Sequence, residues 1–483
     1  MTDLMIKTRF APSPTGLLHI GGARTALFSW LYAKKHNGQF FLRIEDTDFN
    51  RSTKKAVDTI IEGLSWLGLQ GDMPPSYQSE NFNRYEKIMQ KLLDEGKAYR
   101  CYCSVERLQK LRNNQIVNKK KPRYDGHCRN FYNQKQKNKL NVVRFKNPLQ
   151  GNVEWRDAVK GNLRVENKEL DDLIIWRSNN TPTYNFCSVI DDIDMLITHV
   201  IRGDDHVNNT PRQINLYNAL EANTPVFAHL PMIFSAVGEK LSKRNGSVSV
   251  TEYRNLGYLP QALINYLVRL GWSCGDKEIF TLNEILKHFD LKNINNSPAI
   301  LNTEKLNWIN QYYMRHLPVS QVSKNLKWHF DNAGLDFNSG PKCNELIPVM
   351  VRKVKTLKEL IKASSYFYTE FDDYNKKAFE RHLTIEALKP LKNVYLRFKD
   401  IPDVHWQNQE NLYRELKAIA TELSLDMGKV GMPVRVAVTG DFYSPEIGLT
   451  LKFLGKERVI SRLKRAICAI EQQDKTIKKD RLT

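Results

Sequence analysis

The segment Arg9–Leu27 (RFAPSPTGLLHIGGARTAL) constrains the fold of this chain more than any other stretch. It places two prolines, three glycines and a histidine between an apolar run, Met5–Phe10, and a run with helical spacing, Ala23–Lys35. A second apolar run, Phe40–Ile44, follows. This order predicts a βαβ unit whose turn presents backbone N–H groups and the positive end of a helix to a phosphate chain.

A second set of strand signals lies much further along the chain. Met195–Arg202 and Val226–Phe234 are strand candidates, and Pro211–Leu220 between them has helical spacing. Both sets together predict an α/β fold, a Rossmann-like doubly wound parallel sheet interrupted by an insertion. The insertion spans about Cys101–Asn180, and its segment Asn113–Tyr124 (NNQIVNKKKPRY) is expected to be a polar loop.

The length of 483 residues exceeds what a single core supports, so several domains are expected. After Gly257 the pattern becomes helical, with Leu259–Leu270 and Asn283–Phe289 as candidates and an α-rich final third. The predicted domains are residues 1–100 and 191–256 for the two halves of the sheet, 101–190 for the insertion, 257–325 for a helical connection and 326–483 for a helical partner-binding region.

The formal net charge of +20 indicates a polyanionic partner, although a basic bias of the whole proteome is the alternative. Residues 101–150 hold thirteen Lys and Arg against two Asp and Glu, which concentrates the surplus in the insertion. Seven scattered cysteines do not form a disulfide framework, and no stretch is long and apolar enough for a membrane span. Together with the lack of a signal-peptide pattern, this predicts a cytoplasmic protein.

A short basic loop is the second chemical signal. Gly238–Ser247 (GEKLSKRNGS) places Lys240, Lys243 and Arg244 around a serine. Such a run is most often a solvated loop, but lysines between glycines can also neutralise the charge on a leaving pyrophosphate.

The two motifs together resemble the HIGH and KMSKS signatures of class I aminoacyl-tRNA synthetases. They read His19-Ile20-Gly21-Gly22 and Lys240-Leu241-Ser242-Lys243-Arg244 here. Gly22 stands where the first signature has its second histidine, and in this the motif resembles that of the bacterial glutamyl-tRNA synthetases. Further segments also resemble this family: Leu42–Asp48, Leu170–Arg177, Pro182–Phe186, His199–His206, Gly257–Trp272 and Met427–Gly440.

The resemblance implies an enzyme of protein synthesis that uses ATP and Mg²⁺. It would form glutamyl adenylate from L-glutamate and then charge the 3′ end of tRNA(Glu), releasing AMP and diphosphate. Its expected partners are tRNA(Glu), L-glutamate and ATP, with no membrane or DNA partner. The inserted region would bind the acceptor stem, and the helical region would bind the anticodon.

A glutamate substrate needs fixed cations for its carboxylates, and arginine provides them best. Arg9 and Arg202 end two predicted strands, at the edge where doubly wound sheets bind ligands. The resemblance implies a glutamate pocket of Arg9, Ala11, Ser13, Glu45, Tyr184 and Arg202, with Glu45 on the ammonium group. Ser188 lies at a position that varies in the family.

The resemblance also implies the nucleotide-binding residues. They are Pro12, Gly16, His19, Gly21, Gly22, Lys240, Ser242 and Lys243. Among them His19, Lys240 and Lys243 would be catalytic, holding the phosphates as charge moves onto the pyrophosphate.

Cys101, Cys103 and Cys128 are close enough in sequence for a structural zinc site. In the resembling family the fourth ligand is a tyrosine four residues before the third cysteine or a histidine two residues after it. The second position is Asn130 here, which leaves Tyr124 and the adjacent His127. Three free cysteines in a basic loop are the alternative.

Arg352 and Lys353 lie in a basic run that could be a solvated helix face. In the resembling family this stretch belongs to the anticodon-binding region, so either residue is a candidate for contact with tRNA.

Other classes of protein explain the sequence less well. A tRNA-modifying relative would end soon after the basic loop, and a glutaminyl-tRNA synthetase would have β-barrels in place of the helical region. A non-catalytic RNA-binding protein would not retain His19, Lys240 and Lys243. A small-molecule nucleotidyltransferase would not need the basic insertion.

Overall fold

The computed structural model describes residues 5–48, 51–130, 141–235, 237–239 and 248–480. The chain forms two compact units. The first contains residues 1–254 and 260–306, and the second contains residues 255–259 and 307–483. The expected connection 257–325 is thus divided between the units, while the finer domain boundaries remain predictions.

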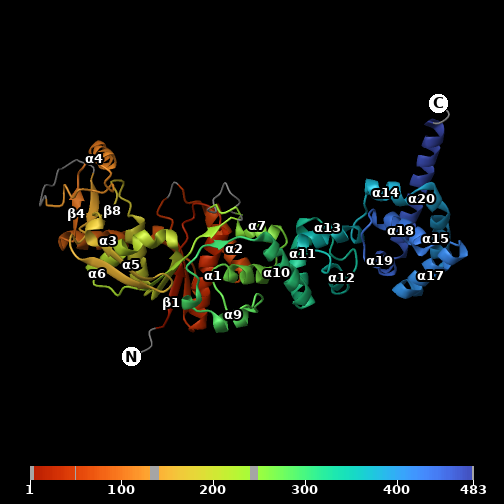
Figure 1. Cartoon of the computed structure of the whole chain (residues 1–483), viewed down its shortest axis with the longest axis horizontal. Helices are drawn as coiled ribbons and strands as arrows, with labels where there is room; N and C mark the ends of the chain where they lie inside the picture. Colours follow the sequence, from red (N-terminus) through yellow and green to blue (C-terminus); the bar gives the residue numbers. More distant parts are fainter. Residues whose placement is uncertain (1–4, 49–50, 131–140, 236, 240–247, 481–483) are drawn as a thin grey trace. The chain divides into compact units, whose positions relative to one another are not determined.

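A five-stranded parallel sheet forms the centre of the first unit (Figure 1). Its order is β10-β9-β1-β2-β3, and the strands are β1 (Lys7–Phe10), β2 (Gln39–Ile44), β3 (Ser76–Tyr77), β9 (His199–Gly203) and β10 (Val226–Leu230). The order runs in opposite directions from β1, towards β2 on one side and towards β9 on the other. The predicted doubly wound sheet is therefore confirmed, and its switch point lies at β1.

Local sequence explains the two helices that follow the first strands. His19 caps α1 (Ile20–Lys35), because its ring nitrogen Nδ1 accepts a hydrogen bond of 3.2 Å from the backbone N–H of Gly22. Thr53 caps α2 (Lys54–Leu67) in the same way, and Gly68 ends it in the left-handed conformation at φ 73°. Both helices pack an apolar face into the core, so the turn before α1 is held firmly.

The insertion is built from a small antiparallel sheet and a hairpin. The sheet pairs β4 (Ala98–Cys101), β5 (Val142–Phe145) and β8 (Ile174–Trp176), and the hairpin pairs β6 (Asn152–Asp157) with β7 (Gly161–Glu166). The helices α3 (Phe82–Asp94) and α5 (Tyr184–Asp194) join this insertion to the central sheet, and α6 (Thr210–Ala219) connects β9 to β10. Apolar residues of α3, β5 and α5 share one core cluster.

One expectation for the insertion is wrong. The helix α4 (Val105–Val117) includes the first part of the expected polar loop Asn113–Tyr124. No residue of α4 is buried, and Leu108 is only partly buried against the cysteine cluster, so packing on a core contributes little to the helix. Instead, Ser104 caps it by accepting a 3.2 Å hydrogen bond from the Arg107 backbone N–H.

The remaining α-helices and strands of the first unit are short. They are β11 (Ile233–Phe234), α7 (Val250–Asn255), which ends at the unit boundary, α8 (Pro260–Arg269), α9 (Leu282–His288) and β12 (Ala299–Ile300).

The second unit has only helices among the regular elements of its described residues, as expected. The boundary falls within α10 (Thr303–His316). The following helices are α11 (Val319–Asn332), α12 (Cys343–Met350), α13 (Leu357–Ser364), α14 (Lys376–His382), α15 (Leu388–Asp400), α16 (Asp403–Trp406), α17 (Gln409–Glu422), α18 (Met427–Thr439), α19 (Ile447–Leu454) and α20 (Lys456–Asp480).

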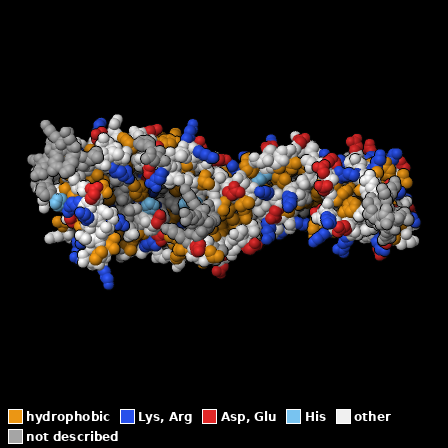
Figure 2. Space-filling view, turned by 90° about the horizontal axis from the view of Figure 1, so that it is seen from above, with side chains coloured by type: hydrophobic (Ala, Val, Ile, Leu, Met, Phe, Trp, Pro, Cys, Tyr) orange, Lys and Arg blue, Asp and Glu red, His pale blue; other side chains and the backbone are white. Residues whose placement is uncertain are grey.

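The described surface mixes charges of both signs. Figure 2 shows Lys and Arg side chains interspersed with Asp and Glu along the visible face of both units. None of the described helices is long and apolar enough to cross a membrane.

Candidate active site and cysteine cluster

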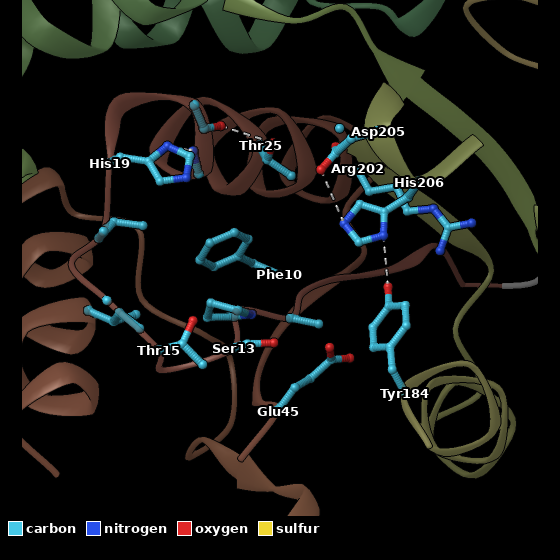
Figure 3. Close-up of a pocket in the computed structure, with 18 of the residues that line it drawn as sticks. Phe10, Ser13, Thr15, His19, Thr25, Glu45, Tyr184, Arg202, Asp205 and His206 are labelled. Carbon is cyan, nitrogen blue, oxygen red and sulfur yellow. Dashed lines mark hydrogen bonds and ion pairs between the residues drawn. The ribbon is translucent and has the colours of Figure 1, made fainter. Parts of the chain in front are cut away.

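A cavity of about 760 Å³ opens at the carboxyl ends of the central strands, beside the switch point (Figure 3). All of the expected glutamate and nucleotide residues that the structure describes line it: Arg9, Ala11, Pro12, Ser13, Gly16, His19, Gly21, Gly22, Glu45, Tyr184 and Arg202. Lys240, Ser242 and Lys243 lie outside the described residues.

Arg9 is held at the cavity wall by a buried carboxylate. Its Nε lies 3.1 Å and its Nη2 3.3 Å from the two oxygens of Asp192, and both side chains are about 5% exposed. Asp192 also accepts a 2.6 Å bond from Arg43. Burial raises the pKa of Asp192, but Arg43 and Arg9 outweigh this and leave the pKa below its ordinary value, so the residue stays ionised.

Glu45 faces the cavity between Ser13 and Tyr184 (Figure 3). Its Oε1 accepts hydrogen bonds from Ser188 at 2.9 Å and from Arg43 at 3.2 Å. Burial raises the pKa of Glu45, while the charges of Arg43 and Arg9 oppose the rise. Arg43 is itself completely buried, and its carboxylate neighbours raise its pKa well above the ordinary value despite burial. Arg43 thus provides one buried positive charge for both Glu45 and Asp192.

Arg202 is the second arginine of the cavity and is 5% exposed. Its Nε donates to His229 at 3.1 Å and its Nη2 donates to Thr210 at 2.8 Å. Its buried Nη1 has no partner among the described residues. Burial lowers the pKa of Arg202, and the charge of Arg9 adds to this effect. No ion pair joins Arg202 to a carboxylate among the described residues. A ligand with a carboxylate would supply the missing partner.

Tyr184 and His206 form a pair in the lining of the same cavity. The Tyr184 hydroxyl lies 3.2 Å from His206 Nδ1, as the dashed line in Figure 3 marks. Burial and the charge of Arg202 lower the pKa of His206 to about 4, so its ring is neutral at pH 7. Sequence reasoning named Tyr184 but missed His206, although both belong to quoted motifs.

His19 lies at the start of α1 and lines the same cavity. Desolvation by the surrounding pocket lowers its pKa, and Asp205 raises it in part. A Cβ at Gly21 would stand 3.2 Å from the His19 ring, so a larger residue there would crowd it. Ser249 forms an antiparallel β-bridge with His19.

Cys101, Cys103 and Cys128 converge in the insertion. Their sulfur atoms all lie within 4.8 Å of one another, and Cys103 and Cys128 are 3.5 Å apart. Tetrahedral zinc thiolates have Zn–S bonds of about 2.3 Å, which sets sulfur atoms a little under 4 Å apart. This donor set fits a metal ion.

Tyr124 completes this cluster. Its hydroxyl oxygen lies 3.4 Å from the Cys101 sulfur and 3.7 Å from that of Cys103, and it accepts a 2.8 Å bond from the Cys128 backbone. His127 is exposed and does not belong to the group of converging ligand atoms. Of the two candidates for a fourth ligand, the geometry favours Tyr124.

Arg352 and Lys353 lie in the second unit, in the turn after α12. Both side chains are exposed, and Arg315 donates a 2.9 Å bond to the Arg352 carbonyl. The turn is therefore fixed while its two basic side chains remain accessible.

Models of two protein families match the chain. The catalytic domain of class I tRNA synthetases (E and Q) matches residues 5–308, and an anticodon binding domain matches residues 321–467.

Curated relatives match along almost the full length. A glutamate–tRNA ligase of Francisella tularensis subsp. novicida is 53% identical over 463 residues, which cover 96% of this chain and 99% of the relative. One from Legionella pneumophila is 52% identical over 464 residues, covering 96% and 98%.

Solved structures match as well. The crystal structure of a glutamate tRNA ligase from Elizabethkingia meningosepticum, in complex with its amino acid, has a TM-score of 0.82 at 29% identity and covers 97% of this chain and 100% of its own. That of the synthetase from Elizabethkingia anophelis has a TM-score of 0.79 at 30% identity, with 96% and 100% covered.

Proposed function

This chain belongs to the class I tRNA synthetases for glutamate and glutamine, and we propose that its activity is that of a glutamate–tRNA ligase. It activates L-glutamate with ATP and transfers it to the 3′ end of tRNA(Glu), releasing AMP and diphosphate. The observation that carries the choice of amino acid is Arg202, a buried cation at the cavity whose Nη1 has no partner among the described residues.

The glutamate pocket comprises Arg9, Ala11, Ser13, Glu45, Tyr184 and Arg202 in this proposal. Arg202 and Arg9 meet the carboxylates of the substrate, and Glu45 meets its ammonium group. The neutral His206 fixes the Tyr184 hydroxyl by hydrogen bonding. A glutamine substrate would leave a buried arginine without a counter-charge, which disfavours it.

The nucleotide occupies the part of the cavity lined by Pro12, Gly16, His19, Gly21 and Gly22. The substrate α-carboxylate attacks the α-phosphate in line, and the N-terminal end of α1 stabilises negative charge there. His19 holds the phosphates, and Lys240, Ser242 and Lys243 of the basic loop stabilise the charge of the pyrophosphate. Class I synthetases use ATP with Mg²⁺, which supplies charge neutralisation on the phosphates.

Cys101, Cys103, Cys128 and Tyr124 hold a structural zinc ion in this proposal, supported by their convergence. Zinc content of the purified protein, measured by mass spectrometry, is expected to be near one ion per chain. It should fall in Cys103→Ser but not in Cys274→Ser, whose cysteine lies apart from the cluster. Equal zinc in both variants would refute the site.

Several wider assignments belong to the same proposal. The protein acts in the cytoplasm, residues 101–190 bind the acceptor stem, and Arg352 or Lys353 contacts the anticodon region. The match of residues 321–467 to an anticodon binding domain supports the last assignment.

Aminoacylation of total bacterial tRNA with radiolabelled glutamate and, in parallel, glutamine tests the central proposal. Wild type should charge glutamate only. Arg202→Gln should lose about a hundred-fold in kcat/KM for glutamate, because a charged hydrogen bond is removed from a buried site. Arg84→Gln, which removes an exposed ion pair with Asp194, is the matched control and should stay near wild type. Charging of glutamine alone, or of neither amino acid, would refute the proposal.

A further inference from the structure

Gln78 is a buried polar residue on the floor of the same cavity. It follows β3 directly, as the first residue of the short 3₁₀ helix η1 (Gln78–Asn81), and therefore lies at the carboxyl edge of the sheet, as do Ala11 and Glu45. It lines the cavity and is 1% exposed. No sequence motif pointed to it.

Its neighbours fix the orientation of its amide. The Nε2 group donates a 2.7 Å hydrogen bond to Asp191 Oδ2. Asp191 also accepts a 2.7 Å bond from the Tyr85 hydroxyl and lies 3.5 Å from Arg43 Nε. Because Asp191 is surrounded by donors, it acts as an acceptor, and the NH₂ group of Gln78 must face it.

This arrangement leaves the carbonyl oxygen of Gln78 without a donor. In the described part of the chain, Oε1 is buried and makes no hydrogen bond. A buried acceptor without a partner is costly, and such exceptions call for a specific explanation. A donor carried by a ligand of the cavity would remove that cost.

The substrate of the proposed function brings such a donor. The α-ammonium group of glutamate has three N–H bonds, so a single carboxylate does not satisfy it. Glu45 is already engaged through Oε1 with both Ser188 and Arg43. A further acceptor is needed near Glu45, and Gln78 lines the same cavity.

We propose that Gln78 Oε1 accepts a hydrogen bond from the α-ammonium group of bound glutamate, which makes Gln78 a substrate-binding residue beside Glu45. This inference rests on the proposed function, since it takes glutamate as the ligand. The amide contributes without adding a negative charge to a region that already holds Glu45 in the cavity wall and the buried Asp191 and Asp192 behind it.

A purely structural role for Gln78 is the competing explanation. In that case it would only tie the end of β3 to α5 through Asp191. Tyr85→Phe separates the two explanations, because it removes another hydrogen bond from the same carboxylate and Tyr85 does not line the cavity.

The test compares wild type, Gln78→Met and Tyr85→Phe in aminoacylation. Two quantities are measured: KM for L-glutamate, and the inhibition constant of glutarate, which keeps both carboxylates but lacks the ammonium group. In Gln78→Met, KM should rise on the order of ten-fold while the glutarate constant stays within about two-fold. In Tyr85→Phe, both should stay within about two-fold of wild type.

Other results have distinct meanings. An unchanged KM in Gln78→Met, an equal weakening of glutarate, or the same rise in Tyr85→Phe would overturn the role of Gln78 and leave the proposed function standing. Failure of wild type to charge glutamate would overturn the proposed function, and this inference with it.

Discussion

Buried charges determine the geometry of the cavity at the level of single residues. Arg9 and Arg43 share Asp192, and Arg43 also pairs with Glu45. Breaking a buried pair leaves an uncompensated charge, which costs more than the pair contributes when intact. The network therefore matters more for positioning Arg9 and Glu45 than for the overall stability it adds.

Asp192→Asn should lower the free energy of unfolding of the first unit by about 3 kcal/mol, because Arg9 and Arg43 both lose a counter-charge. It should also raise KM for glutamate, since Arg9 is no longer held. The matched control is Asp194→Asn on the same helix, whose pair with Arg84 is exposed and should be worth less than about 1 kcal/mol. Urea unfolding provides the measurement, and equal losses in both variants would contradict the expectation.

His199 makes the first unit sensitive to acid. Its Nε2 lies 3.3 Å from the Tyr32 hydroxyl, and burial together with the charge of His36 lowers its pKa to about 4. In the unfolded chain the pKa returns to its ordinary value of 6.5. The unfolded state therefore binds a proton that the folded state does not, and stability is lost as pH falls from 6.5 towards 4.

Between pH 7 and pH 5 this difference amounts to about 2 kcal/mol for one histidine. His199→Gln replaces the titrating ring with a neutral side chain. Between pH 7 and pH 5, its free energy of unfolding should therefore fall by about 2 kcal/mol less than that of the wild type. Urea unfolding at the two pH values measures it, and parallel losses would show that His199 does not contribute.

The sequence predicts the strand-end arginines but not the residues that hold them. Arg9 and Arg202 follow from their positions at the ends of predicted strands. Asp192 and Arg9 are 183 positions apart, and nothing local in the sequence pairs them. His206 and Gln78 were missed for the same reason, because their importance comes from burial and from partners on other elements.

At the scale of secondary-structure elements, capping residues and turns determine where the helices begin and end. The expected helices Ala23–Lys35, Pro211–Leu220 and Leu259–Leu270 appear with their bounds shifted by a few residues, because each has an apolar face that packs on the core. The helix α4 overlaps the segment expected to be a loop, because none of its residues is buried and its apolar side chains contribute little to a core. Periodicity thus predicts helices that pack and overlooks those stabilised by their ends.

Gly68 provides a test of such an end. It terminates α2 at φ 73°, and a Cβ there would meet nothing within 4 Å, so a substitution acts through the backbone alone. Gly68→Ala should lower stability by about 1 kcal/mol. Gly68→Asn should cost less, since asparagine tolerates this conformation better. Thermal unfolding of both variants measures this, and an alanine variant as stable as the asparagine variant would contradict it.

The whole molecule divides its tasks between two units. The cavity and the cysteine cluster belong to the first unit, and the candidate anticodon residues belong to the second. The predicted α/β and α-helical parts are confirmed at this scale. The predicted domain bounds at 257 and 326 remain predictions, and the two units divide at residues 254–260 and again within α10.

Arg352→Ala and Lys353→Ala in combination should raise KM for tRNA about five- to ten-fold and leave KM for glutamate unchanged, because phosphate or base contacts are lost far along the chain from the cavity. Lys389→Ala removes an exposed charge elsewhere in the second unit and serves as the control. Steady-state aminoacylation measures both constants. A rise in KM for glutamate, or the same effect in the control, would argue against a specific tRNA contact.

Neighbouring strands of the central sheet lie far apart in the sequence, and this affects how the chain folds during its synthesis on the ribosome. In the folded protein Lys7 donates a 2.8 Å hydrogen bond to Thr198, across 191 positions of the chain. A ribosome adding about 5 to 20 residues per second needs roughly 10 to 40 seconds to cover that distance. During this time one edge of β1 has no neighbouring strand, which exposes it to wrong pairing. The nascent chain thus carries Arg9 long before Arg202 exists, and the cavity can form only after the entire insertion has been made.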